Sequence, residues 1–139
     1  MDIKKGSNVD IVVKDIYNWV EIENESYDIV ISGQAFEHMD YFWKAAEEMT
    51  RILKPNGYLC IIVPSAGPVH RNPVDCYRFK EDGMKAIAKY VKLNMLEVYM
   101  NHDNQWHDCV LVARKDEKNL EDRINNLENK IDLILKKLE

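Results

Sequence analysis

The sequence predicts an α/β domain with a mostly parallel sheet, followed by a C-terminal coiled-coil helix. Short apolar runs rich in β-branched residues alternate with amphipathic helical segments, which is typical of strand–helix–strand units. The last two runs are joined by a short polar segment, which favours a C-terminal antiparallel hairpin. Beyond them, leucine and isoleucine recur in alternating steps of four and three residues. We therefore expect an α/β domain at residues 1–114 and an oligomerisation helix at residues 115–139.

The composition and charge argue against several classes of function. The chain has 139 residues, of which 46% are hydrophobic and 31% charged, and this is enough for one packed domain. A net charge of −5 without a basic stripe argues against a nucleic-acid partner. The longest apolar run, at residues 58–64, is too short to span a bilayer, and the N-terminus lacks a signal-peptide core. We therefore expect a cytoplasmic protein without a membrane partner.

The cysteines agree with that compartment. Cys60, Cys76 and Cys109 are odd in number and show no C-x-x-C spacing. We interpret all three as reduced thiols in or near the core, with no disulfide and no metal site among them.

Three apolar runs, at residues 8–15, 27–32 and 58–64, are expected to be strands. The runs are continuous rather than strictly alternating, which favours a sheet covered on both faces. Three more elements are expected near the C-terminal end of the domain: a helix at residues 81–91 and two strands at residues 94–100 and 108–114. The segment at residues 65–79 is expected to be irregular.

A helix is expected between the second and third strands, with Asp40 as its N-cap. Its apolar positions recur at three and four residues, which marks one helix face; they are Phe42, Ala45, Ala46, Met49, Ile52 and Leu53. Residues 54–57, Lys-Pro-Asn-Gly, end the helix because Pro55 excludes Lys54 from helical geometry. Strand, helix and strand at this spacing predict a parallel crossover.

The C-terminal tail carries a heptad seam. The a positions are Ile124, Ile131 and Leu138, and the d positions are Leu120, Leu127 and Ile134. We expect this seam to join copies of the chain as a dimer or trimer, and because it is shorter than three heptads it needs support from the domains. The alternative is a helix that folds back on its own domain.

Polar chemistry gathers where the expected strands end, which is where ligands bind in open α/β sheets. The first strand ends in Asp15, followed by Ile16. The second is followed by "SGQAFEHM", which contains Gln34, Glu37 and His38. The third leads into "HRNPVDCYRF", which contains a histidine, two arginines and an aspartate at His70, Arg71, Arg78 and Asp75. We interpret these segments as the rim of a binding site.

Two stretches carry a resemblance to a known family. "VDIVVKD" and "ESYDIVISGQAFEHMDYFWKAAEEMTRILKPNGYLCIIVPS" resemble the later portion of class I S-adenosylmethionine-dependent methyltransferases of the type 11 kind. The resemblance covers roughly residues 8–114 and implies a Rossmann-like sheet that binds S-adenosylmethionine. "HRNPVDCYRF" is similar to a segment of methyltransferases that modify glycans.

The resemblance assigns cofactor-binding residues. Asp15 matches the acid that accepts a hydrogen bond from the adenine amino group, with the Ile16 backbone beside it. Ser32, Gly33 and Gln34 match the segment that lines the methionine and sulfonium end. Glu37 and His38 match a Glu-His pair that is either structural or substrate-facing.

The chain departs from the family at its start. The family's glycine-rich turn and the acid that holds the ribose hydroxyls have no counterpart, since the five glycines form no such motif; they are Gly6, Gly33, Gly57, Gly67 and Gly83. The strands and helices that carry these motifs would lie between the strand at residues 8–15 and the strand at residues 27–32. The first strand must therefore pair directly with the second or with another subunit. The departure also puts cofactor binding in question.

These observations leave two main hypotheses for function. The first is a methyltransferase for a sugar or glycan acceptor, completed by a second copy or by a complementing polypeptide. In this hypothesis His70 is the first candidate for the catalytic base, followed by His38 and Asp75. Arg71 and Arg78 would hold an anionic acceptor. The second is a non-catalytic methyltransferase remnant that serves as an oligomerising scaffold. In a structural interpretation of the same loop, Asp75 pairs with Arg71 or Arg78.

A third hypothesis is a metal site in "NHDNQWHD", formed by His102, Asp103, His107 and Asp108. No rigid element fixes these side chains, so we favour a solvated hairpin loop and predict no metal ion.

Overall fold

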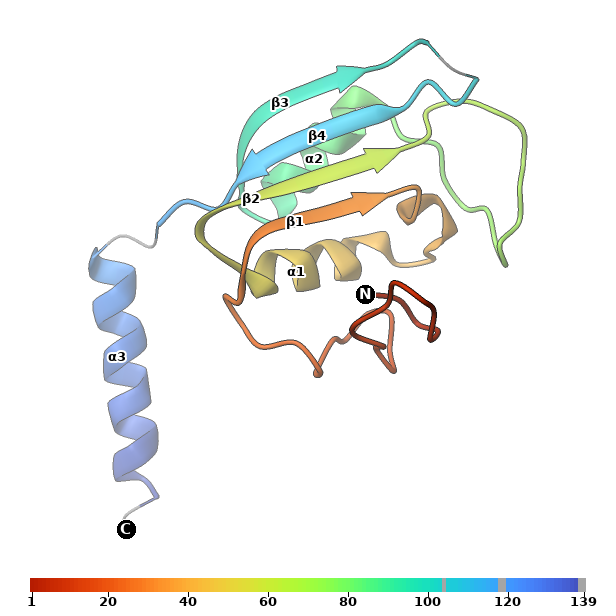
Figure 1. Cartoon of the computed structure of the whole chain (residues 1–139). Helices are drawn as coiled ribbons and strands as arrows, with labels where there is room; N and C mark the ends of the chain where they lie inside the picture. The colour runs from red at the N-terminus through yellow and green to blue at the C-terminus, as the bar shows by residue number, and fades with distance from the viewer. Residues whose placement is uncertain (104, 118–119, 138–139) are drawn as a thin grey trace.

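A mixed four-stranded sheet forms the centre of the molecule (Figure 1). The computed structural model describes residues 1–103, 105–117 and 120–137. The strands are β1 (Tyr27–Gly33), β2 (Leu53–Val63), β3 (Asn94–Met100) and β4 (Cys109–Arg114). Their order is β1-β2-β4-β3; β1 and β2 are parallel, and β4 is antiparallel to both neighbours. The predicted C-terminal hairpin is present. Because β4 lies between β2 and β3, only one neighbouring pair is parallel, and the mostly parallel sheet is not confirmed.

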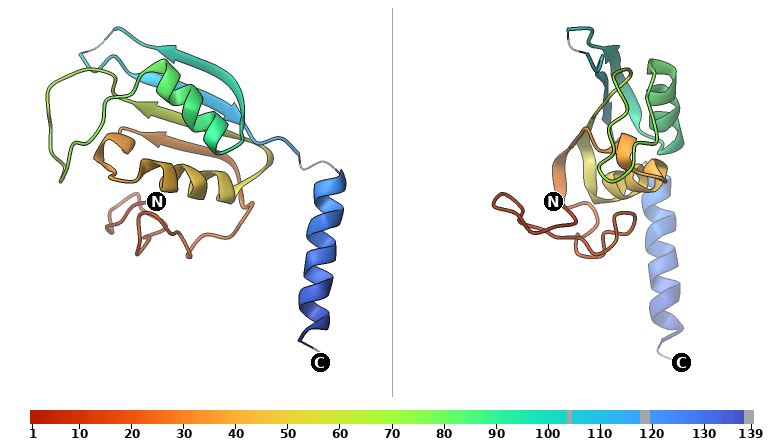
Figure 2. Two further views of the ribbon diagram at one scale, coloured as in Figure 1. Left: turned by 180° about the vertical axis from the view of Figure 1, so that it is seen from behind. Right: turned by 90° about the vertical axis from the view of Figure 1, so that its right-hand side faces the viewer.

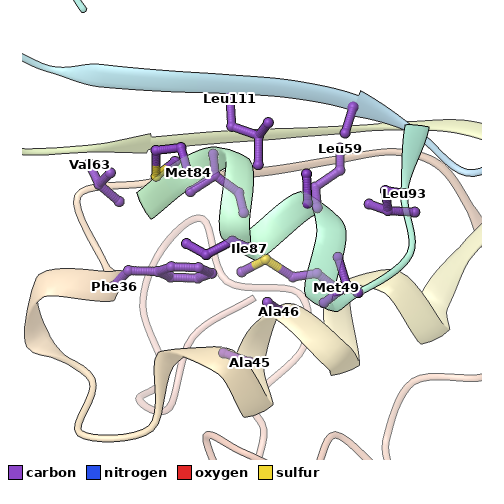
Figure 3. Packing of buried hydrophobic residues seen from close by; sticks show 14 of the residues in the cluster. Phe36, Ala45, Ala46, Met49, Leu59, Val63, Met84, Ile87, Leu93 and Leu111 are labelled. Atoms are coloured by element: carbon purple, nitrogen blue, oxygen red, sulfur yellow. The ribbon is translucent and has the colours of Figure 1, made fainter. Parts of the chain in front are cut away.

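Two helices, α1 (Phe42–Ile52) and α2 (Glu81–Tyr90), cover one face of the sheet (Figure 2). The buried apolar residues of both helices face the strands and pack in the same core as Leu59 and Leu111 (Figure 3). Each of the larger side chains, methionine or isoleucine, stabilises the fold by roughly 1.5–3 kcal/mol when it is fully buried. The buried helix residues are Ala45, Ala46, Met49, Ile52, Met84, Ile87 and Ala88.

The ends of α1 differ from the prediction in one respect. Tyr41, not Asp40, is the N-cap residue, and no side chain caps the helix. The Asp40 carboxylate instead accepts a contact of 3.5 Å from the Cys76 sulfur. At the other end, a Cβ atom on Gly57 would lie 2.8 Å from the Asp28 carbonyl oxygen. Only glycine therefore allows this early part of β2 to approach the Asp28 carbonyl of β1 so closely.

The second face of the sheet is open, which corrects the prediction of a sheet covered on both faces. Ile29 and Ile31 on the edge strand β1 keep 60% and 68% of their surface exposed, and Tyr58 beside them is exposed as well. In the described part of the chain, both helices that pack on the sheet lie on the same face, so nothing in it covers the other. The continuous apolar runs therefore arise because the second face of the sheet also carries apolar side chains, although no described segment packs on that face.

Residues 8–15 form no strand, and this prediction was wrong. They belong to an irregular N-terminal segment that lies below β1 and α1 in Figure 1, with one parallel bridge between Asp2 and Val12. The segment is held by burial of Val13, Trp19 and Ile22 rather than by a ladder. A strand needs a neighbour for its backbone donors and acceptors, and this segment pairs neither with β1 nor with any other described strand.

The last element, α3 (Leu120–Leu135), projects away from the sheet in both views (Figures 1 and 2). The alternative of a helix folded back on its domain is thus not what the structure shows. The seam residues Ile124, Leu127, Ile131 and Ile134 are exposed, whereas Leu138 lies outside the described residues. A coiled coil is not confirmed by one chain. None of the described helices is long and apolar enough to cross a membrane.

Candidate functional site

The polar segments predicted to form a site rim do converge at one end of the sheet. The carboxyl ends of β1 and β2, the 3₁₀ helix η1 (Phe36–His38), the loop at residues 64–80 and the loop of the β3–β4 hairpin all lie there (Figure 1). Gln34 links two of these segments, because its Nε2 donates to Asp108 Oδ1 at 2.8 Å. The Cys76 N–H donates to the Glu37 carbonyl at 2.7 Å and joins the long loop to η1.

A hollow of about 690 Å³ lies between β1 and the N-terminal segment. Ligand pockets commonly have volumes of about 300–1,000 Å³, so this hollow has room for a small molecule. Five residues of the predicted site contribute to its lining, and they are Ile16, Ser32, Gly33, Gln34 and His38. Four of the five predicted cofactor residues are therefore brought together around one space.

Asp15 is the predicted cofactor residue that does not line the hollow. Its Oδ1 accepts a hydrogen bond of 2.8 Å from the Tyr17 N–H and closes a local turn. The turn replaces the strand end that the prediction assumed, and it explains why the carboxylate points elsewhere.

The residues at the hollow fit one wall of an S-adenosylmethionine pocket. A Cβ atom on Gly33 would meet no atom within 4 Å, so packing within the chain does not require a glycine there. The free space beside Gly33 faces the hollow that it helps to line. The glycine-rich turn and the ribose-binding acid of the family are not in this sequence, so the opposite wall is not built from the family's own motifs.

The loop at residues 64–80 is organised by Asp75. Its Oδ2 accepts hydrogen bonds from the His70 N–H at 2.7 Å and from Arg78 Nη2 at 2.8 Å. The Arg78 guanidinium, helped by the His70 N–H, holds the pKa of Asp75 well below its ordinary value. Asp75 is therefore an ionised carboxylate committed to closing the loop, as in the structural interpretation of this segment. The same pairing occupies Arg78, while Arg71 is exposed and makes no ion pair with any described residue.

His38 and His70 face each other above Glu37. The two imidazole rings are 4.8 Å apart, and the His70 ring also packs 4.7 Å from the Trp106 indole. His38 Nδ1 lies 2.6 Å from the Val74 carbonyl oxygen. Glu37 is fully buried, and burial raises the pKa of its carboxyl. The cluster combines two imidazoles with a carboxylate at the rim of the site.

Glu37 and Trp106 are site residues that the predicted set left out. The Glu-His pair was visible in the sequence, but nothing local shows that Glu37 is buried against a histidine from another loop. Trp106 belongs to the hairpin loop and contacts His70 and Gly67, which are far from it in the sequence. No sequence pattern predicts contacts of this kind.

The two remaining predictions concern the hairpin loop and the cysteines. His102 and His107 have rings 5.0 Å apart, but the group of three metal-ligating side chains that the described residues bring together lies elsewhere, at Glu37, His38 and His70.

All three cysteines are free thiols. Cys109 is buried and Cys60 half-buried, whereas Cys76 is exposed and corrects its assignment to the core.

Comparison with known proteins identifies the fold. Residues 2–61 match the family model described as a methyltransferase domain. The resemblance to S-adenosylmethionine-dependent methyltransferases is confirmed. No curated protein matches the chain.

Solved structures of methyltransferases and of a cyclase share the fold at low sequence identity. The 1,6-didemethyltoxoflavin-N1-methyltransferase of Burkholderia thailandensis, crystallised with S-adenosylhomocysteine, is 16% identical, with a TM-score of 0.56 over 68% of this chain and 46% of that one. A SAM-dependent methyltransferase of Methanosarcina mazei is 13% identical, with a TM-score of 0.60 over 75% and 66%. The [4+2]-cyclase SpnF is also 13% identical, with a TM-score of 0.61 over 75% and 54%. The chain thus spans about half to two-thirds of these relatives, and the methyltransferase fold alone does not specify the reaction.

Proposed function

We propose that this chain forms part of an S-adenosylmethionine-dependent methyltransferase that acts on a sugar or glycan acceptor. The observation that carries the proposal is the hollow beside the carboxyl end of β1, where Ile16, Ser32, Gly33 and Gln34 come together. These are the positions that the family resemblance assigns to the cofactor.

The chain's own residues have distinct roles in this proposal. Bound S-adenosylmethionine supplies a methyl group on a positively charged sulfur. Ser32, Gly33 and Gln34 form the wall against which the cofactor lies, and the link from Gln34 to Asp108 keeps that wall in place. The proton acceptor lies in the cluster of His38 and His70 at the rim, where positioning of the acceptor hydroxyl would contribute most to the rate.

The acceptor-binding role falls to Arg71 rather than Arg78. The two terminal nitrogens of Arg78 donate to Asp75 and to the Pro68 carbonyl, so the end of its guanidinium is engaged within the loop. Arg71 is exposed on the same loop and can pair with a phosphate or carboxylate on a sugar. The similarity of this loop to segments of glycan-modifying enzymes supports such an acceptor.

Cofactor binding tests the proposal. We expect S-adenosylmethionine and S-adenosylhomocysteine to raise the melting temperature in proportion to the logarithm of their concentration above the Kd. Gly33→Val should fold and fill the hollow, because a Cβ atom meets nothing there, and should weaken binding at least about tenfold, which is a loss of about 1.4 kcal/mol. Cys60→Val is the matched control on the neighbouring strand, since Cys60 does not line the hollow. Equal binding by the wild type and Gly33→Val would contradict the assignment of the site.

The second function, a non-catalytic oligomerising scaffold, is favoured by a different observation. The seam of α3 is exposed and projects from the end of the sheet opposite to the site (Figure 1). Self-association without any cofactor-dependent stabilisation would support the scaffold and contradict the enzyme. Cofactor binding in either oligomeric state would support the enzyme.

Two surfaces that no described segment covers, the seam of α3 and the open side of β1, indicate where partners would bind. We propose that α3 joins copies of this chain along its heptad seam. The open edge and face of β1, with Ile29 and Ile31 exposed, is the place where a complementing polypeptide would supply the missing wall. A cytoplasmic location stays a prediction that the free thiols support.

A further inference from the structure

The cluster at the rim of the site has the composition of a metal centre. Glu37 and His38 come from η1, and His70 comes from the loop at residues 64–80. One ligand atom from each residue lies within 4.8 Å of the others, and His38 Nε2 is 3.7 Å from Glu37 Oε1. Two imidazoles and a carboxylate are a common ligand set for zinc and for other first-row transition metals in enzymes.

The second observation is the state of Glu37. Its side chain is 0% exposed, and neither carboxylate oxygen has a hydrogen-bond partner among the described residues. A buried carboxylate without a hydrogen-bond partner is strongly unfavourable, because burial removes its water, and the nearby charges of His38, His70 and Arg78 offset that loss only in part. The nearby Arg78 does not donate to it, since the guanidinium bonds run to Asp75, Tyr77 and Pro68. A bound cation would supply the missing partner.

The third observation is the orientation of the histidines. The Val74 carbonyl only accepts hydrogen bonds, so His38 Nδ1 carries the proton of the neutral ring and Nε2 offers its lone pair on the side of Glu37. Metal-bound histidines in proteins are commonly oriented in this way by a backbone carbonyl or a carboxylate. His70 is not oriented in this way: its Nδ1 is buried without a hydrogen bond to any described residue, and Asp75 Oδ2 lies 3.6 Å from it.

We propose that Glu37, His38 and His70 bind a divalent transition-metal ion, with Zn²⁺ as the best match to this ligand set. Zinc–ligand bonds of about 2.0–2.2 Å bring tetrahedral ligand atoms to about 3.4 Å from one another. Binding therefore draws the three groups together by up to about 1.4 Å from their present 4.8 Å limit. His70 is expected to make most of this movement, since 37% of its side chain is exposed.

Three protein ligands leave a fourth position on the ion open. His38 lines the hollow, so this position lies at the rim of the space proposed for the cofactor. A zinc-bound water is acidic near neutral pH and would accept a proton as hydroxide, which places the base of the proposed reaction on the ion rather than on free His70. Metal binding itself does not depend on that reaction, so it can fail or succeed separately from cofactor binding.

Titration of the purified chain with Zn²⁺ alone tests the proposal. We expect one ion per chain, measured by competition with a chromophoric chelator, and a rise in melting temperature with Zn²⁺ concentration. His70→Asn, at a partly exposed position, should still fold and should weaken binding by more than about 100-fold, since even the outer partners of metal ligands are worth 10–100-fold. Glu37→Gln should do the same while keeping the shape of the side chain.

The matched control removes two histidines outside the cluster. His102→Asn combined with His107→Asn should bind Zn²⁺ as the wild type does. Binding that is lost in this double variant, or kept in His70→Asn, would place the ion elsewhere and overturn the proposal. If Zn²⁺ neither binds nor stabilises the wild type, the proposal is also overturned and Glu37 is a protonated, neutral side chain. Replacing Zn²⁺ by Co²⁺ gives a second readout, because its visible absorption reports a tetrahedral nitrogen and oxygen environment.

Discussion

The Trp19 N–H donates a hydrogen bond of 2.7 Å to Glu48 Oε2, which joins the irregular N-terminal segment to helix α1. Arg51, one turn further along the helix, donates to Glu48 and to the Trp19 carbonyl at 2.8 Å each. This arrangement gives a segment without regular structure a fixed position. It also holds one side of the hollow, because Trp19 is part of the lining.

Replacing Glu48 is expected to destabilise the chain in a pH-dependent way. The hydrogen bonds from Arg51, more than that from Trp19, lower the pKa of the Glu48 carboxyl below 4.5. The stabilisation is therefore present above about pH 4.5 and is lost as the pH falls through the lower folded pKa. Glu48→Gln should reduce the free energy of unfolding by about 1–2 kcal/mol at pH 7, and the difference should be smaller at pH 3, where more of the carboxyl is protonated. Urea unfolding at the two pH values measures both numbers.

Glu23→Gln is the control for that prediction. Glu23 lies on the same segment and is exposed, and none of its side-chain atoms bonds to a described residue. Its replacement should change the stability by less than about 0.5 kcal/mol at either pH. A difference between Glu48→Gln and the wild type that does not depend on pH would show that charge is not the cause.

Gly67→Ala is expected to disturb the site through Trp106. Gly67 has φ +92°, where side chains are strained, and an added Cβ would collide with the Trp106 indole. The cost should be about 1–3 kcal/mol, and displacement of the indole should free the His70 ring that packs on it. Tryptophan fluorescence and thermal unfolding report the two effects. Gly83→Ala, in α2 with open space around it, should instead leave stability unchanged or raise it by up to about 1 kcal/mol.

Lys115→Met is expected to loosen the junction between α1 and the end of β4. Lys115 Nζ donates to the carbonyl oxygens of Leu53 at 2.7 Å and Thr50 at 3.0 Å, where the helix would otherwise leave acceptors unpaired. The loss should be about 1–3 kcal/mol in chemical unfolding. Lys89→Met, an exposed lysine on α2 with no side-chain hydrogen bond to a described residue, should be nearly neutral. Equal effects of both variants would argue for a general effect of charge.

The proposed association through α3 predicts that replacing Ile131 and replacing Leu133, two nearby apolar residues of the helix, will affect self-association differently. Ile131 belongs to the seam and Leu133 does not, yet they are almost equally exposed, at 55% and 57%. Ile131→Asn should convert the oligomer to monomers in analytical ultracentrifugation, whereas Leu133→Asn should not. A wild-type chain that is monomeric at about 100 μM would contradict the proposal, since a short seam supported by domains must bind at least that tightly. Equal behaviour of the two variants would contradict the assignment of the seam.

Local patterns were sufficient for most elements of the fold. A continuous apolar run identified β1, the three- and four-residue spacing of apolar positions identified α1, and the segment expected as a helix at residues 81–91 matches α2, each to within one or two residues. The polar rim at the carboxyl ends of β1 and β2 followed from the same reasoning. The family resemblance added four of the residues that line the hollow, and this assignment did not depend on the missing glycine-rich turn.

Other features depend on contacts between distant parts of the chain. Residues 8–15 have the composition of a strand but no partner to complete a ladder, so they remain irregular, and Asp15 turns away from the hollow. The position of β4 between β2 and β3 makes the sheet mixed. Glu37 and His70 are 33 positions apart in the sequence, and they meet because the loop at residues 64–80 is fastened to η1 through Cys76 and Val74. Periodicity describes which face of an element is buried, whereas pairing and long-range contact depend on which other elements exist to meet it.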